Sequence, residues 1–196
     1  MLENNIYHIY NRGNNKENIF FEEKNYLFFL QRFRFYLCDL VKVYSFCLMP
    51  NHFHILLEVK DFGDDKKINY TNKELSQLEK AFKGFFMSYS KAINKAFDRT
   101  GSLFQKKFKR KIIHDENYLK SIVAYIHLNP VRADLVNSAE LWPYSSYKFF
   151  AGEQINMLNI DKNEVLSWFS GKHNFIEFHK LYREFQKDRD YLFSEQ

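Results

Sequence analysis

Two apolar segments rich in β-formers, residues 43–48 and 52–59, are separated only by Met49, Pro50 and Asn51. Proline fixes φ and asparagine tolerates unusual backbone angles, so this tripeptide is typical of a turn. The two segments are therefore predicted to pair as a β-hairpin.

The other elements follow from the spacing of apolar side chains. The predicted ranges are 6–12 and 103–113 for strands, and 24–40, 73–97 and 116–129 for helices. Asp115 is a suitable N-cap for the last helix, and Pro130 is predicted to end it. The order β-α-β-β-α-β and a further helix predicts an α+β fold, a ferredoxin-like (split βαβ) antiparallel sheet with two helices on one face and the third on the other.

The C-terminal part is predicted to extend this domain, because no repeat or Pro/Gly linker sets it apart. Residues 1–150 are assigned to the sheet domain and residues 151–196 to a helical extension packed on it. The aromatic segment 141–152 is predicted to be irregular, and short helices are predicted at 164–169 and 176–187. The polar segment 61–72 is predicted to be a flexible loop.

Composition favours an anionic partner without requiring one. The chain has 196 residues and a net charge of +5, and its 13 Tyr include rings free to stack on bases. Two distant cysteines, Cys38 and Cys47, do not make a disulfide framework, which indicates a reducing compartment. The start of the chain lacks a signal-peptide layout, and charges interrupt its most apolar region, so we expect a cytoplasmic protein without a membrane span.

The strongest local motif is His52-Phe53-His54 on the second strand of the hairpin. Side chains alternate along a strand, so both imidazoles face one way, about 7 Å apart, and Phe53 faces the other. Two imidazoles so placed can bind one divalent cation, although the spacing does not select the metal. The alternative is two unrelated polar residues on a solvated face.

A second motif lies on the helix predicted at 116–129. Tyr125 and Asn129 are four residues apart and share one helical face, at the edge of the apolar stripe. A nucleophile could sit at such an edge. The alternative is an ordinary amphipathic ring followed by a helix-end residue before proline.

Basic residues supply a third motif. Lys107, Lys109 and Lys111 would share one face if 103–113 were a continuous strand, and such a row could neutralise a nucleic-acid backbone. A short basic run is equally typical of a solvated edge strand. Arg12 lies in a turn from which it could contact phosphate or a base edge; a plain loop residue is the alternative.

Together these motifs closely resemble the REP-associated branch of the IS200-like tyrosine transposases, in the HUH endonuclease superfamily, over residues 7–152. They are, in chain order, Tyr7-His8, Asn11-Arg12-Gly13-Asn14, Met49-Pro50-Asn51-His52-Phe53-His54, Gly101-Ser102-Leu103-Phe104-Gln105, Tyr125-Ile126-His127-Leu128-Asn129-Pro130-Val131-Arg132-Ala133 and Trp142-Pro143-Tyr144-Ser145-Ser146-Tyr147. The strings around His52 and Tyr125 are the most specific.

The resemblance implies a role for each matched position. His52 and His54 correspond to the paired metal-binding histidines, and Tyr125 to the single catalytic tyrosine. Asn129 falls where relatives carry a third polar metal ligand, often glutamine. Asp134 departs from the usual glycine but lies beyond the helix.

The activity expected from the resemblance is that of a DNA transposase and single-strand endonuclease. Members need Mg²⁺ or Mn²⁺, cleave one DNA strand, and leave a 5′-phosphotyrosine and a free 3′-OH. The implied partner is single-stranded or hairpin DNA in a prokaryotic, nucleoid-associated setting. The resemblance is compatible with a monomer and with a homodimer.

Two other functions compete with this one. The first is a domesticated, non-catalytic protein that binds single-stranded nucleic acid, because RRM domains share the predicted topology. The second is a metallohydrolase that activates water, with Glu58 and His127 as additional ligands. Tyr118, seven residues before Tyr125, is the alternative nucleophile.

Overall fold

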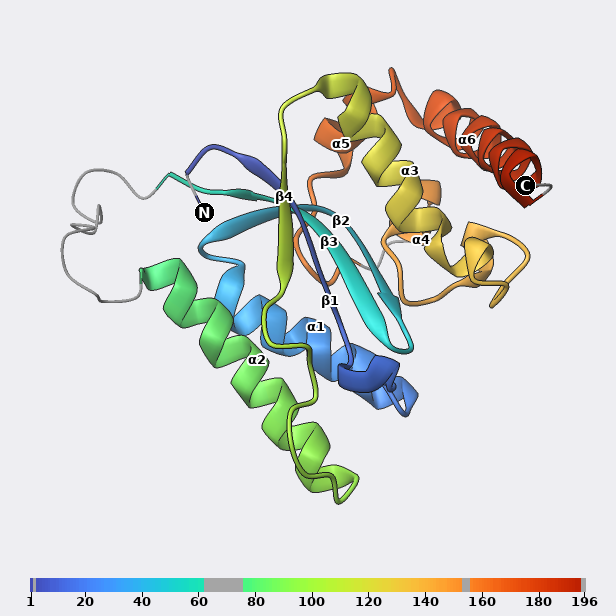
Figure 1. Ribbon diagram of the computed structural model, residues 1–196. Coiled ribbons are helices and arrows are strands. Elements are labelled where there is room, and N and C mark those ends of the chain that lie inside the picture. The colour runs from blue at the N-terminus through green and yellow to red at the C-terminus, as the bar shows by residue number, and fades with distance from the viewer. Residues whose placement is uncertain (2, 62–75, 153–155, 195–196) are drawn as a thin grey trace.

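A four-stranded antiparallel sheet in the order β2-β3-β1-β4 forms the centre of the computed structural model (Figure 1). The structure describes residues 1, 3–61, 76–152 and 156–194. The strands are β1 (Ile6–Arg12), β2 (Val41–Met49), β3 (His52–Val59) and β4 (Lys109–Ile113). This is the split βαβ order, and the predicted fold class is confirmed. Most of the predicted loop at 61–72 lies outside the described residues.

One face of the sheet is covered by α1 (Glu23–Leu37) and α2 (Gln77–Ala96), which pack against each other. The alternation along β3 sends Phe53 to this face, where its ring lies 5.1 Å from that of Phe29. A capping box of Ser76 and Glu79 begins α2. These apolar contacts leave the other face of β3 for its polar side chains.

The opposite face is covered by α3 (Glu116–Arg132), whose N-cap is Asp115, as predicted. The prediction that Pro130 ends this helix is wrong, because α3 continues to Arg132. Proline in the last turn removes only one N–H donor. The amide of Ala133 still donates to the Asn129 carbonyl at 3.0 Å, which closes the turn.

The fourth strand is shorter than the predicted range 103–113. Leu103 and Phe104 are adjacent and both buried, which the alternation of a strand with one solvated face does not permit. The Gln105 amide instead donates to the Arg12 carbonyl at 3.0 Å, and regular pairing begins only at Lys109. Lys107 therefore lies before β4.

The C-terminal elements contact the α3 side of the molecule (Figure 1). They are a 3₁₀ turn (Ala139–Leu141), α4 (Tyr147–Ala151), α5 (Lys162–Trp168) and α6 (Lys172–Ser194). The expectation of an irregular segment at 141–152 is wrong where α4 forms. Among the described residues, no helix is long and apolar enough to cross a membrane.

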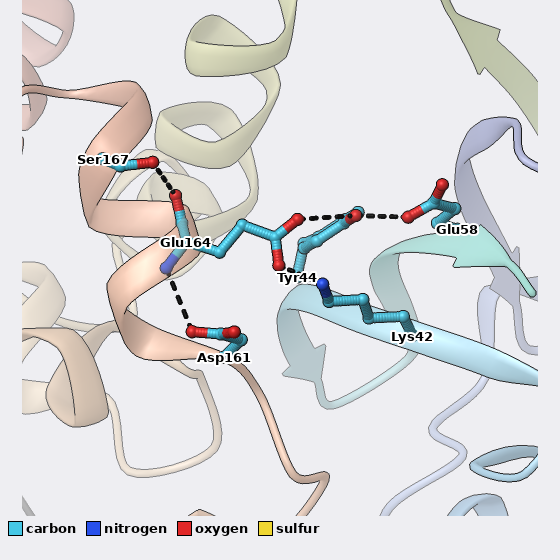
Figure 2. Close-up of polar contacts among 6 residues, drawn as sticks. All are labelled: Lys42, Tyr44, Glu58, Asp161, Glu164 and Ser167. Atoms are coloured by element: carbon cyan, nitrogen blue, oxygen red, sulfur yellow. Dashed lines mark hydrogen bonds and ion pairs between the residues drawn. The ribbon is translucent and has the colours of Figure 1, made fainter.

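Polar contacts attach these elements to the sheet and to α3. The Tyr44 hydroxyl on β2 lies between the carboxylates of Glu58 and Glu164, and so connects the sheet to α5 (Figure 2). His127 on α3 is fully buried and hydrogen-bonds to His179 on α6 at 3.0 Å. The extension therefore contacts the back of α3.

Candidate active site

Pairing of β1 with β3 places three further side chains beside the two histidines. Tyr10 is the register partner of His54, and Arg12 is the partner of His52. Register partners in an antiparallel pair point to the same face. His8 is two residues before Tyr10 and shares that face, which is the one covered by α3.

Tyr125 projects from α3 onto this group. Its ring centroid lies 5.5 Å from that of His54 and 6.1 Å from that of His8, in edge-to-face arrangements. The Arg132 guanidinium lies 5.5 Å from the Tyr125 ring centroid. The structure therefore brings together the tyrosine and the paired histidines that the sequence singled out.

The histidines are held by hydrogen bonds through defined ring nitrogens. The rings of His52 and His54 are perpendicular, with centroids 5.2 Å apart. His54 Nδ1 lies 2.9 Å from His8 Nε2, and His52 Nδ1 lies 2.6 Å from the Asn51 side-chain oxygen. Both contacts use Nδ1, so Nε2 is the nitrogen of each ring that could ligate a metal.

All three imidazoles are neutral at neutral pH. Burial, with a smaller effect of Arg12, lowers the pKa of His52 to about 4, and a hydrogen bond with Asn129 opposes the shift. Burial and the neighbouring His8, His52 and Arg12 hold the pKa of His54 well below its ordinary value. Burial and Lys111 lower the pKa of His8 to about 4. Neutral imidazole is the form that binds metal.

Asn129 completes a donor set that fits a divalent cation. Its amide nitrogen donates to the Tyr125 carbonyl at 2.9 Å, and its side chain is also hydrogen-bonded to His52. Neutral imidazoles ligate many divalent metals and an amide oxygen suits Mg²⁺ or Mn²⁺, so this set fits a divalent cation without selecting one. Within the described ranges, no group of three or more His, Cys, Asp or Glu side chains is arranged to hold a metal ion.

The predicted row of three lysines does not form. Lys109 and Lys111 pair with Tyr10 and His8, so both lie on the histidine face. The Lys109 ammonium lies 6.0 Å from the Tyr10 ring centroid. Lys107 precedes the strand and lines a hollow beside α2 on the other side of the sheet. The prediction is wrong for Lys107, because the chain leaves the ladder before Lys109.

The alternative nucleophile and the additional ligands have other partners. The Tyr118 hydroxyl accepts a hydrogen bond from Lys111 at 2.8 Å, whereas Tyr125 packs against His54. Glu58 lies four residues after His54 on β3, and its carboxylate accepts a hydrogen bond from the Tyr44 hydroxyl (Figure 2). His127 points to Ser146 and His179. Neither Glu58 nor His127 therefore adds a ligand beside His52.

Sequence reasoning did not assign roles to His8 and Arg132. Both belong to the quoted motifs, and His8, Tyr10 and Arg12 alternate as strand face-mates do. Their position beside the histidines depends on the register of β1 against β3 and on the length of α3, which the motifs alone do not define.

The fold and this face define a class: a ferredoxin-like α+β domain with a helix-borne tyrosine over paired histidines. No family model matches the chain. A Haemophilus influenzae protein, named provisionally as a REP-associated tyrosine transposase, is 28% identical over 106 residues. The match covers 53% of this chain and 57% of the relative, so the chain spans little more than half of that relative's length.

Solved structures with a similar fold include a REP-associated tyrosine transposase bound to a REP hairpin. It superposes with a TM-score of 0.60 at 14% identity, over 82% of this chain and 87% of that one. A bacterial tRNA(His) guanylyltransferase-like protein in complex with GTP has a TM-score of only 0.38, at 8% identity and over 69% and 70% of the two chains, which is a weak likeness. The chain is therefore similar in sequence over about half its length, and in fold over most of it, to REP-associated tyrosine transposases.

Proposed function

We propose that this protein nicks and rejoins single-stranded DNA through a covalent link between Tyr125 and a 5′-phosphate. The observation that carries the proposal is the position of the Tyr125 ring, edge-on to His54 and 5.5 Å from it, on a face that also presents Arg12. A tyrosine, two neutral imidazoles and an arginine side chain thereby lie on one face, which supports the proposal.

The proposed reaction is an in-line displacement at phosphorus. The phenol oxygen of Tyr125 forms a bond to phosphorus while the bond from phosphorus to the 3′ oxygen breaks. The phenol proton is released, and the departing 3′ oxygen takes up a proton to become a free hydroxyl. Because the phosphotyrosine conserves the bond, attack by another 3′-OH reverses the reaction and joins strands.

His52, His54 and Asn129 would hold the divalent cation, Mg²⁺ or Mn²⁺. When bound, that ion would neutralise the phosphoryl oxygens and stabilise the developing charge on the leaving oxygen. Asn51 and His8 orient the two imidazoles through their other nitrogens.

Fixed positive charges surround the same face. Arg12 is close enough to lower the pKa values of His52 and His54, and Arg132 stacks over Tyr125. Guanidinium groups bind phosphate oxygens through directed hydrogen bonds. Because a structural relative is bound to a REP hairpin, we propose single-stranded DNA next to a hairpin as the substrate.

The test compares Tyr125→Phe with the matched variant Tyr118→Phe on fluorescent hairpin oligonucleotides and Mn²⁺. Wild type and Tyr118→Phe are expected to give a protein–DNA adduct stable to denaturant, and Tyr125→Phe none. Cleavage retained by Tyr125→Phe would favour the metallohydrolase. DNA binding without cleavage by wild type across a hairpin library would favour the non-catalytic binder.

A further inference from the structure

A large groove lies on the opposite side of the sheet from the candidate active site. It has a volume of about 850 Å³ and runs between α2 and the segment 101–110. Its α2 wall extends from Leu78 to Ser90, which at 1.5 Å per residue is a length of about 18 Å. The proposed reaction uses none of this space.

Aromatic rings form the floor of the groove. The Phe108 ring is stacked on Phe82 at 4.9 Å and on Phe86 at 5.6 Å between centroids, with interplanar angles of 28° in both pairs. Phe86 and Phe108 are only partly buried, and Met87 beside them is 61% exposed. Partly open, nearly parallel rings are suited to stacking on unpaired bases.

The rim of the groove is basic. Four basic side chains line the groove: Lys83, Lys106, Lys107 and Arg110. The one carboxylate among the lining residues is Glu79. Positive charge along both walls of an aromatic groove complements a phosphodiester backbone whose bases point inward. Polar groups at the base of the groove include Asn11, whose amide nitrogen donates to the Gln105 carbonyl at 3.4 Å.

The groove and the histidine face lie on the two sides of β4, at one edge of the sheet. β4 is an outer strand, with Lys109 and Lys111 on the histidine face and Arg110 on the other. Lys107, which does not join the lysine row, lines the groove two residues before β4 begins. A polynucleotide can pass around this edge along basic side chains without crossing the sheet.

We propose that the groove between α2 and residues 101–110 is a second binding site for single-stranded DNA. It would hold a few unpaired nucleotides, with bases on Phe86 and Phe108 and phosphates on the lysines of the rim. It extends the proposed function by holding a flank of the strand that is cleaved at Tyr125.

Photocrosslinking tests the groove independently of cleavage. Tyr125→Phe protein is irradiated with single-stranded oligonucleotides that carry 5-iodouracil at successive positions, and the modified peptides are identified by mass spectrometry. Crosslinks are expected at Phe86, Met87 or Phe108 for a set of positions in the flank. Crosslinks confined to the histidine face would overturn the proposal.

Binding measurements supply a second readout. Lys83→Ala is expected to lower the salt slope of oligonucleotide affinity by about 0.7 log units, whereas Lys91→Ala, an exposed lysine on the same helix outside the groove, leaves it unchanged. Phe108→Leu is expected to weaken oligonucleotide binding about fivefold or more, because one stacking ring is lost. The control Phe35→Leu, at an exposed ring outside the groove, is expected to leave the affinity unchanged. Equal effects of Lys83→Ala and Lys91→Ala would refute the site.

The two proposals fail separately. Groove crosslinks without any phosphotyrosine in wild type would refute the nicking reaction and retain the groove. A phosphotyrosine at Tyr125 without groove crosslinks would retain the reaction and refute the groove.

Discussion

Replacement of His8 by phenylalanine is expected to weaken metal binding although His8 is not a proposed ligand. His8 Nε2 lies 2.9 Å from His54 Nδ1, and both side chains are only 5% exposed. A metal at Nε2 of His54 requires the proton on Nδ1, where His8 accepts it. In the variant this buried N–H has no acceptor.

The size of the effect follows from that lost hydrogen bond. An unsatisfied buried donor costs about 1–3 kcal/mol, and loss of such an outer-shell partner typically weakens metal affinity about 10–100-fold. Phenylalanine preserves ring volume and the stacking on Tyr10, whose centroid is 5.0 Å from His8, so the fold should persist. His8→Gln restores an acceptor and is expected to recover part of the affinity.

The assay is a Mn²⁺ titration of the protein without DNA, followed by the electron paramagnetic resonance signal of free Mn²⁺. His114→Phe, a change at an exposed histidine, is the matched control and should bind as wild type does. An affinity of His8→Phe within twofold of wild type, together with loss of binding in His54→Ala, would refute the reasoning.

Three further predictions concern acid stability, a buried hydrogen bond and the metal. Burial lowers the pKa of His179 to about 4, so the unfolded state gains a proton near pH 6.5 that the folded state does not. The free energy of unfolding should therefore fall by up to about 3 kcal/mol between pH 6.5 and pH 4 through this group. Urea titrations of His179→Phe should show a weaker pH dependence than those of wild type. Tyr89→Phe removes a buried donor 2.7 Å from the Ile19 carbonyl and should cost about 1–3 kcal/mol in urea unfolding; an unchanged midpoint would contradict this. EDTA should abolish oligonucleotide cleavage and Mn²⁺ should restore it, and cleavage undiminished by EDTA would contradict a metal requirement.

The sequence predicted the elements whose signals are local. Alternation along β3 separates His52 and His54 from Phe53, and helical spacing places Tyr125 and Asn129 on one face. The β1 and β3 ranges agree with the structure at both ends. These patterns depend on side-chain periods of 2 and 3.6 residues, which any single segment displays.

Features that depend on distant contacts were not predictable. His8 becomes part of the site only because β1 pairs with β3 in one register. Lys107 leaves the predicted lysine row because the segment before β4 packs its aromatic residues against α2. His127 is oriented by His179, which lies 52 residues later, and no local pattern marks that pair.

The identity of the residue that becomes linked to DNA tests the central claim most directly. A hairpin oligonucleotide with a single scissile strand is incubated with the wild-type protein and Mn²⁺, digested, and sequenced by tandem mass spectrometry. The account predicts a 5′-phosphonucleotide on Tyr125. The same modification on Tyr118, or cleavage that releases both ends free of protein, would contradict it.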